Sequence, residues 1–146
     1  MRSKRFLMTA VVLVFLVGLL AACSKSTDST ASSAPATGSE QGFTVLTAQQ
    51  LHDMMAQQDV YLVNVHVPYE GEITGTDAFI PYTDIASRMS ELPFDKQPVV
   101  IYCRSGVTSG MAAQALVQAG APAFYELEGG YTAWQAAGYP FEVKPK

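Results

Sequence analysis

Two short apolar runs constrain the fold of this chain more than any other feature of its sequence. Residues 60–65 and 99–102 are rich in β-branched and aromatic side chains, without the strict apolar–polar alternation of a half-exposed strand. Such runs are typical of strands that lie in the middle of a parallel sheet and are buried on both faces. Helical patterns alternate with the strand patterns along the chain, which predicts an α/β fold with helices on both faces of the sheet.

The boundaries of several elements follow from local signals. Thr47 and Gln50 have the spacing of a capping box, which predicts a helix over residues 48–57. A second helix is predicted after residue 109 and ends at Gly120. Its core-facing residues are expected to be Met111, Ala115, Leu116 and Ala119. Further expected elements are a short strand at 79–80, a helix capped by Asp84, a strand at 123–127 and a helix at 131–137.

Cys103 is the predicted nucleophile. It follows the apolar run 99–102 and opens a loop of small and polar residues that leads into a helix. Backbone N–H groups and the positive end of a helix dipole favour a thiolate at this position. The loop is expected to bind the substrate through Arg104, Ser105, Gly106, Val107, Thr108 and Ser109. A buried structural cysteine is the alternative, and the polar loop argues against it.

The N-terminal segment predicts export from the cytoplasm. Basic residues in 1–5 precede an uncharged apolar stretch at 6–22, and small residues stand before Cys23. This arrangement is typical of a secretory signal peptide over residues 1–22, and its end resembles a bacterial lipobox that would acylate Cys23. An uncleaved transmembrane anchor is the alternative. Both place the remainder in the cell envelope outside the cytoplasm, and acylation of Cys23 would leave Cys103 as the only thiol.

Composition divides the rest of the chain into a tether and one domain. Residues 24–42 are rich in Ser, Thr, Ala and Gly, so 23–42 is expected to be a lipidated flexible tether. Residues 43–146 fit a single small domain, which we expect to be monomeric. Nine basic and 13 acidic residues give a net charge of −4, and loss of the signal peptide would make it more negative. This balance argues against a nucleic-acid partner and leaves membrane attachment to the lipid.

Three segments of the domain resemble the single-domain rhodanese-like sulfurtransferases: residues 61–70, 99–109 and 127–140. The resemblance implies a small, parallel five-stranded sheet with helices on both faces. It also implies that Cys103 takes a sulfane sulfur from a small donor such as thiosulfate, holds it as a persulfide and passes it to a thiol or to cyanide. Neither a metal nor an organic cofactor is implied.

The departures from the family pattern bear on the donor. Many relatives carry an arginine where Thr108 stands, and an aspartate and an arginine in place of Asn64 and His66. The missing charges weaken the case for an anionic donor and favour a polysulfide or a protein persulfide. His66 is a candidate for donor binding or proton transfer, and the alternative is a histidine that only orders the turn.

Two other functions remain open from the sequence. Some phosphatases share this fold, but they use a loop arginine that is absent here. A non-catalytic binding or thiol-redox sensing module at the membrane is the second alternative. The carboxylates Glu70, Glu72 and Asp77 match no strong metal motif and are expected to be solvated or to cap turns.

Overall fold

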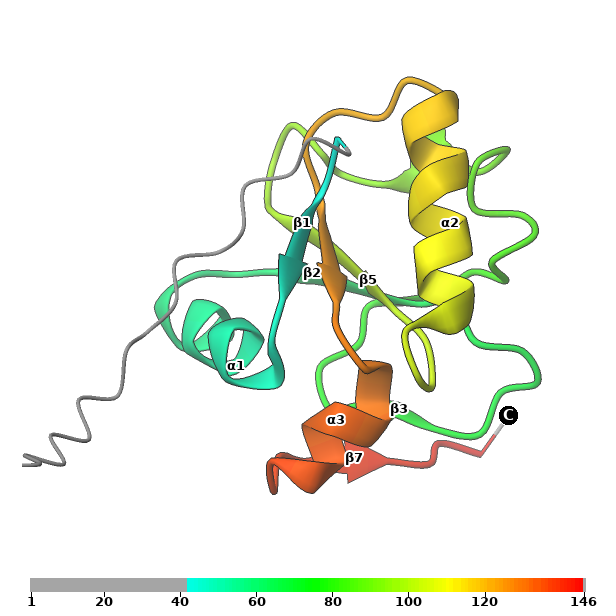
Figure 1. Cartoon of the computed structure of the whole chain (residues 1–146). Helices are drawn as coiled ribbons and strands as arrows, with labels where there is room; N and C mark the ends of the chain where they lie inside the picture. The colour runs from blue at the N-terminus through cyan, green and yellow to red at the C-terminus, as the bar shows by residue number, and fades with distance from the viewer. Residues whose placement is uncertain (1–41, 146) are drawn as a thin grey trace, which may run out of the picture. The chain divides into compact units, whose positions relative to one another are not determined.

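A parallel five-stranded sheet forms the centre of the computed structural model, which describes residues 42–145 (Figure 1). Its strands are β1 (Thr44–Leu46), β2 (Tyr61–Asn64), β4 (Ala78–Phe79), β5 (Val99–Tyr102) and β6 (Tyr125–Leu127). Their order across the sheet is β1-β6-β5-β2-β4, and every neighbouring pair is parallel. All four residues of β5 are buried, as its apolar run predicts for a central strand. The predicted five-stranded α/β fold is confirmed.

Helices cover both faces of this sheet. The helices α1 (Ala48–Gln57) and α3 (Gly130–Ala136) lie on one side, and α2 (Val107–Gln118) lies on the other (Figure 1). Successive residues of β5 point to opposite faces. Val100 and Tyr102 therefore pack in the cluster that includes Leu51 of α1 and Trp134 of α3. The opposite cluster includes Ile101, Cys103 and, from α2, Ala112, Ala113 and Leu116. Cys103 thus belongs to the layer that α2 covers.

The helix α1 has the predicted bounds because its first turn is capped as expected. The Gln50 N–H donates to Thr47 Oγ1 at 3.2 Å, and the Thr47 N–H donates to Gln50 Oε1 at 2.9 Å. These two bonds satisfy backbone donors that have no partner within the helix. The capping box is confirmed.

The buried face of α2 differs from the prediction. The helix begins at Val107, inside the expected loop, and its buried residues are Ser109, Ala112, Ala113 and Leu116. Leu116 is buried as predicted and Ala115 is half-buried, whereas Met111 is 56% exposed and Ala119 is exposed. The rest of the buried face consists of small residues, which the apolar pattern did not mark. A consequence is that Ser109 faces the sheet next to Cys103.

The predicted helix capped by Asp84 is wrong. Hydrogen-bonded turns fill this region, and only a short 3-10 helix, η1 (Met89–Glu91), follows. The Ser87 hydroxyl donates to the backbone carbonyl of Asp84 at 2.8 Å, where it competes with helical hydrogen bonding. Ile85 and Leu92 are nevertheless buried in the α2-side core.

A second, two-stranded antiparallel sheet forms from β3 (Glu72–Ile73) and β7 (Phe141–Glu142). The sequence did not predict it. The Tyr102 hydroxyl ties this region to the central sheet, since it accepts the Ile73 N–H at 3.0 Å and lies 2.6 Å from Thr76 Oγ1.

Within residues 42–145, no helix combines the length and the apolar character needed to cross a membrane. The predicted signal peptide, the predicted lipidation site Cys23 and nearly all of the predicted tether lie outside the described residues.

Candidate active site

Cys103 lies directly after the carboxyl end of β5 and is 1% exposed. Its sulfur accepts hydrogen bonds from the Gly106 N–H at 3.1 Å and from Ser109 Oγ at 3.3 Å. Gly106 is the N-cap of α2 and Ser109 lies in its first turn, so both donors come from the start of this helix. Pocket residues gather at this edge of a parallel sheet because all of its strands end there.

The thiol is biased toward its ionised form. Burial raises the pKa of Cys103, but hydrogen-bond donors outweigh burial and hold the pKa below its usual value. These donors are the hydroxyls of Ser109 and Thr108 and the N–H groups of Ser109 and Ser105. The Thr108 hydroxyl has a smaller effect than that of Ser109, and its buried Oγ1 completes no hydrogen bond among the described residues. A thiolate is the form that attacks sulfur or other electrophiles.

The start of α3 fixes the backbone beneath the nucleophile. The Tyr131 N–H donates to the Cys103 carbonyl at 2.9 Å, and the Thr132 N–H donates to the Arg104 carbonyl at 3.0 Å. Gly130 has a φ of 56°, and a Cβ at this position would overlap the Cys103 carbonyl oxygen. Glycine is therefore required for the helix to approach the loop this closely.

Glu70 gathers three side chains at the edge of the loop. Its carboxylate accepts the Tyr131 hydroxyl at 2.7 Å and the Arg104 guanidinium at 3.1 Å, and it lies 3.4 Å from His66 Nε2. The Tyr131 hydrogen bond, with help from Arg104 and His66, keeps the pKa of Glu70 below its usual value against partial burial. Arg104, the cation that follows the nucleophile, is thus held by a carboxylate instead of standing alone.

His66 and Asn64 order the turn after β2. The His66 N–H donates to Asn64 Oδ1 at 2.9 Å, and Asn64 Nδ2 donates to the Gly71 carbonyl at 2.9 Å. An aspartate at position 64 has no donor for the second bond, so the amide fits this turn. The His66 ring meets Tyr131 edge-on, with ring centroids 5.8 Å apart. The structure places His66 beside Glu70, and its binding role remains a prediction.

The predicted loop residues differ in accessibility. Ser109 is fully buried, Gly106 and Thr108 are half-buried, and Arg104, Ser105 and Val107 are exposed. The structure brings Gly106 and Ser109 to the sulfur directly, whereas Arg104 turns to Glu70. The substrate contacts of all six residues remain predictions.

Sequence reasoning missed Glu126. This carboxyl lies in β6, is 6% exposed and accepts a 2.5 Å hydrogen bond from Ser109 Oγ. Burial, assisted by nearby Glu128 and opposed by Ser109, raises the pKa of Glu126 to about 7. A signal was present in the sequence, since a carboxyl within the otherwise uncharged strand pattern at 123–127 is costly to bury.

Glu72 and Asp77, the other two carboxylates considered in the sequence, have structural partners. Glu72 is buried and pairs with Lys144 at 2.5 Å, so the expectation of a solvated or turn-capping carboxylate is wrong for this residue. Asp77 accepts the Leu62 N–H at 2.8 Å. No group of three or more potential metal ligands occurs in the part of the chain that the structure describes.

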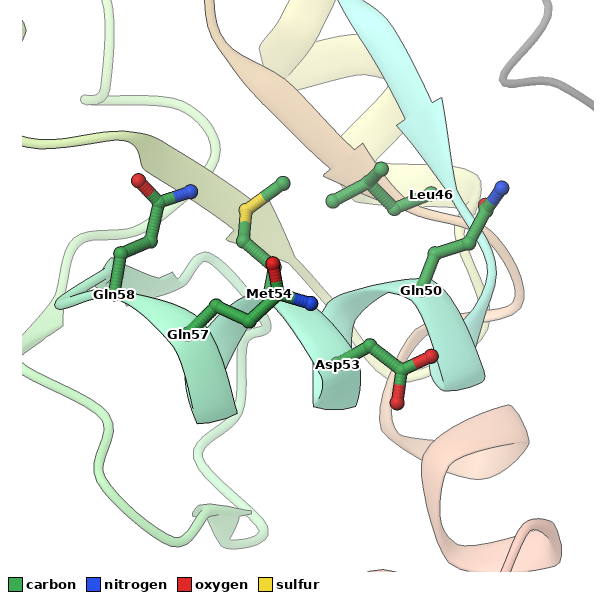
Figure 2. A pocket seen from close by; sticks show the side chains of 6 residues that line it. All are labelled: Leu46, Gln50, Asp53, Met54, Gln57 and Gln58. Carbon is green, nitrogen blue, oxygen red and sulfur yellow. The ribbon is translucent and has the colours of Figure 1, made fainter.

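A shallow pocket lies away from this site. Figure 2 shows that it is lined by side chains of α1 and its flanks, and none of them belongs to the Cys103 loop. The lining residues are Leu46, Gln50, Asp53, Met54, Gln57 and Gln58. They include neither a thiol nor a cation, so this pocket does not extend the site around Cys103.

Fold and site together define an α/β protein with a buried, hydrogen-bonded cysteine at the carboxyl edge of a parallel sheet. The chain belongs to the rhodanese-like domain family, whose family model matches residues 47–137.

Relatives support this assignment. The chain is 36% identical over 98 residues to "Thiosulfate sulfurtransferase GlpE" of Pseudoalteromonas translucida. The match covers 65% of this chain and 91% of that protein. It is 44% identical over 87 residues to "Sulfurtransferase" of Allochromatium vinosum, and the match covers 57% of this chain and 78% of that protein. A crystal structure titled as a rhodanese-like domain protein from Staphylococcus aureus matches with a TM-score of 0.57 at 25% identity, covering 69% of this chain and 98% of that one.

Proposed function

We propose that this protein is a sulfurtransferase that carries a sulfane sulfur as a persulfide on Cys103. The observation that carries the proposal is the Cys103 sulfur itself, which accepts two hydrogen bonds from the loop and has a lowered pKa. The names of the two relatives described above, both sulfurtransferases, support the same chemistry.

The reaction has two displacements. The Cys103 thiolate attacks the outer sulfur of the donor, a new S–S bond forms on Cys103, and the remainder of the donor leaves with the electron pair of the broken bond. An acceptor thiolate or cyanide then attacks the outer sulfur of the persulfide and restores the Cys103 thiolate. The Gly106 N–H and the Ser109 hydroxyl support the negative sulfur in both steps.

The charges around the loop favour a donor whose negative charge is not concentrated. Arg104 is paired with Glu70, and the position of Thr108 supplies a hydroxyl instead of a cation. A compact dianion such as thiosulfate therefore meets no unpaired cation from Arg104. A polysulfide spreads its charge over a longer sulfur chain, and a protein persulfide carries at most one negative charge, so both need less charge compensation. We propose these as preferred donors.

Intact-mass spectrometry tests the sulfur transfer. The full chain is exposed to thiosulfate or to polysulfide, and Cys103→Ser serves as the control. We expect one added sulfur on the wild type, absent in the variant and removed by cyanide or thiol, with faster loading from polysulfide. Absence of loading from both donors contradicts the proposal and favours the binding or redox-sensing module. Faster loading from thiosulfate contradicts only the donor preference.

We further propose that the protein is exported and attached to a membrane through lipid on Cys23. The support is the sequence: a basic start, an uncharged stretch and small residues before this cysteine. Cys23→Ser is expected to abolish acylation, which mass spectrometry of the mature N-terminus detects. An unmodified Cys23 in the membrane fraction of wild-type cells would refute the lipid anchor.

A further inference from the structure

The Ser109 hydroxyl faces two groups that both accept protons. Its Oγ lies 3.3 Å from Cys103 Sγ and 2.5 Å from Glu126 Oε1. A serine hydroxyl carries one hydrogen and can donate only one hydrogen bond along its O–H direction. If both partners were anions, only one of them could accept the Ser109 hydrogen. Cys103 would then keep only the hydrogen bond from the Gly106 N–H, or the buried Glu126 carboxylate would lose the Ser109 hydrogen bond. Both contacts of Ser109 Oγ can be hydrogen bonds only when Cys103 or Glu126 carries a proton of its own and donates it to Ser109.

Glu126 is the group suited to hold that proton. It is 6% exposed, and among the described residues it forms no ion pair. The neighbouring strand β1 and the helix α2 contain no charged residue. Glu128, just beyond the end of β6, disfavours the ionised form of Glu126. Cys103 contacts the same Ser109 hydroxyl, and a thiolate there would disfavour a second negative charge. A neutral Glu126 carboxyl can donate to Ser109 Oγ, which frees the serine hydrogen for the sulfur.

We propose that Glu126 is a positioning residue that shares one proton with Cys103 through Ser109. In one form the thiolate accepts from Ser109 and the neutral carboxyl donates to Ser109. In the other form Cys103 is a thiol and Glu126 is a carboxylate. When the second form converts to the first, the Cys103 S–H bond breaks and its proton forms a new O–H bond on Ser109. The original Ser109 O–H bond breaks, and that proton forms an O–H bond on Glu126. The total charge of the pair stays at minus one.

This inference rests on the proposed sulfurtransferase function and deepens it. The thiol proton needs no exit to solvent when Cys103 becomes a nucleophile, because Glu126 takes it through one hydroxyl. The same proton remains in the pocket while Cys103 carries sulfur. Such a pair titrates in two steps that belong to both groups together.

The thiolate absorbance of the full chain against pH tests the proposal. Each protein is measured against the same protein carrying Cys103→Ser, so that other groups cancel. For the wild type we expect thiolate to form in two steps separated by about one pH unit or more. In Glu126→Gln we expect a single step, because the amide still donates to Ser109 but does not titrate. The matched control is Glu128→Gln, which removes an exposed carboxyl just beyond the end of β6 and should keep two steps.

A second measurement does not depend on how the Glu126 variant folds. The carboxyl carbon of Glu126 is followed by NMR against pH in the wild type and in Cys103→Ser. Because coupling is reciprocal, the loss of the thiol should lower the Glu126 midpoint and leave one step. Identical Glu126 curves in both proteins, or a single thiolate step in the wild type, overturn the proposal. Neither result depends on sulfur loading, so failure here is distinguishable from failure of the proposed function.

Discussion

At the scale of single residues, the buried Cys103 depends on the donors around it. With 1% exposure its sulfur has almost no water to stabilise a negative charge, and burial alone raises its pKa. The loop reverses that effect with the Ser109 and Thr108 hydroxyls and backbone N–H groups. Ser109 also contacts Glu126, whereas Thr108 Oγ1 is buried without a hydrogen-bond partner in the described structure. An unpaired buried hydroxyl costs stability and is available to a ligand.

Thr108→Val separates the effect of the Thr108 hydroxyl on stability from its effect on donor binding. Valine keeps the shape and removes the hydroxyl, so the free energy of unfolding should be unchanged or slightly higher. The pKa of Cys103 should rise because one stabilising dipole is lost. If the hydroxyl binds a charged donor, sulfur loading should slow by about tenfold, as expected for loss of one hydrogen bond to a charged group. Urea unfolding and intact-mass time courses measure the two effects. Unchanged loading would remove Thr108 from donor binding.

Charge at the same position tests the donor preference. Thr108→Arg introduces a cation at the start of α2, and we expect loading from thiosulfate to increase relative to loading from polysulfide. Comparison of the two loading rates, in the wild type and in the variant, gives this ratio directly. A ratio that does not change would show that the missing arginine does not determine the preference.

At the scale of elements, the start of α3 supports the active-site loop. Gly130→Ala places a methyl group against the Cys103 carbonyl and forces a left-handed backbone on alanine. We expect a loss of about 3 kcal/mol in the free energy of unfolding, from overpacking and backbone strain together. Gly138→Ala is the matched control at the end of the same helix, since its φ is 82° but a Cβ there meets no atom within 4 Å. It should cost only about 1 kcal/mol. Equal losses in the two variants would contradict the steric role of Gly130.

The elements that the sequence predicted are those with strong local signals. The helix α1 has a capping box, and β5 is a continuous apolar run, so both appear with the expected bounds. The strands β3 and β7 have two residues each, and their pairing partners are distant in the chain, so no local pattern marks them. The short strand β1 was likewise not predicted from its own residues, and pairing with β6 defines it.

At the scale of the whole molecule, the parallel topology assembles the site from distant segments. Glu70 follows β2, the Cys103 loop follows β5, and Tyr131 follows β6, and hydrogen bonds connect all three. The sequence identified the nucleophile and its loop because they are contiguous. It did not identify Glu126, because contact with Ser109 depends on how β6 and α2 pack, and the sequence did not mark Ser109 as part of the buried face of α2.

This buried carboxyl should also make the stability of the whole domain depend on pH. The pKa of Glu126 is raised from 4.5 in its ordinary state to about 7 in the fold. The stability that the neutral carboxyl contributes is fully present below pH 4.5 and is lost as the pH rises toward 7, because the unfolded chain releases this proton first. The free energy of unfolding should therefore fall by about 2 kcal/mol between pH 5 and pH 7 from this group.

Urea unfolding at several pH values measures that slope, and Glu126→Gln should remove it. Glu70 and Glu91 have lowered pKa values, so their contributions are lost only as the pH falls below their usual range, outside this window. The difference between wild type and variant therefore reports Glu126 together with the Cys103 titration coupled to it, and Glu128→Gln should retain most of the slope. If the wild type and Glu126→Gln have parallel pH profiles, the native carboxyl is ionised throughout. It then cannot supply the second proton that the hydrogen-bond geometry of Ser109 requires.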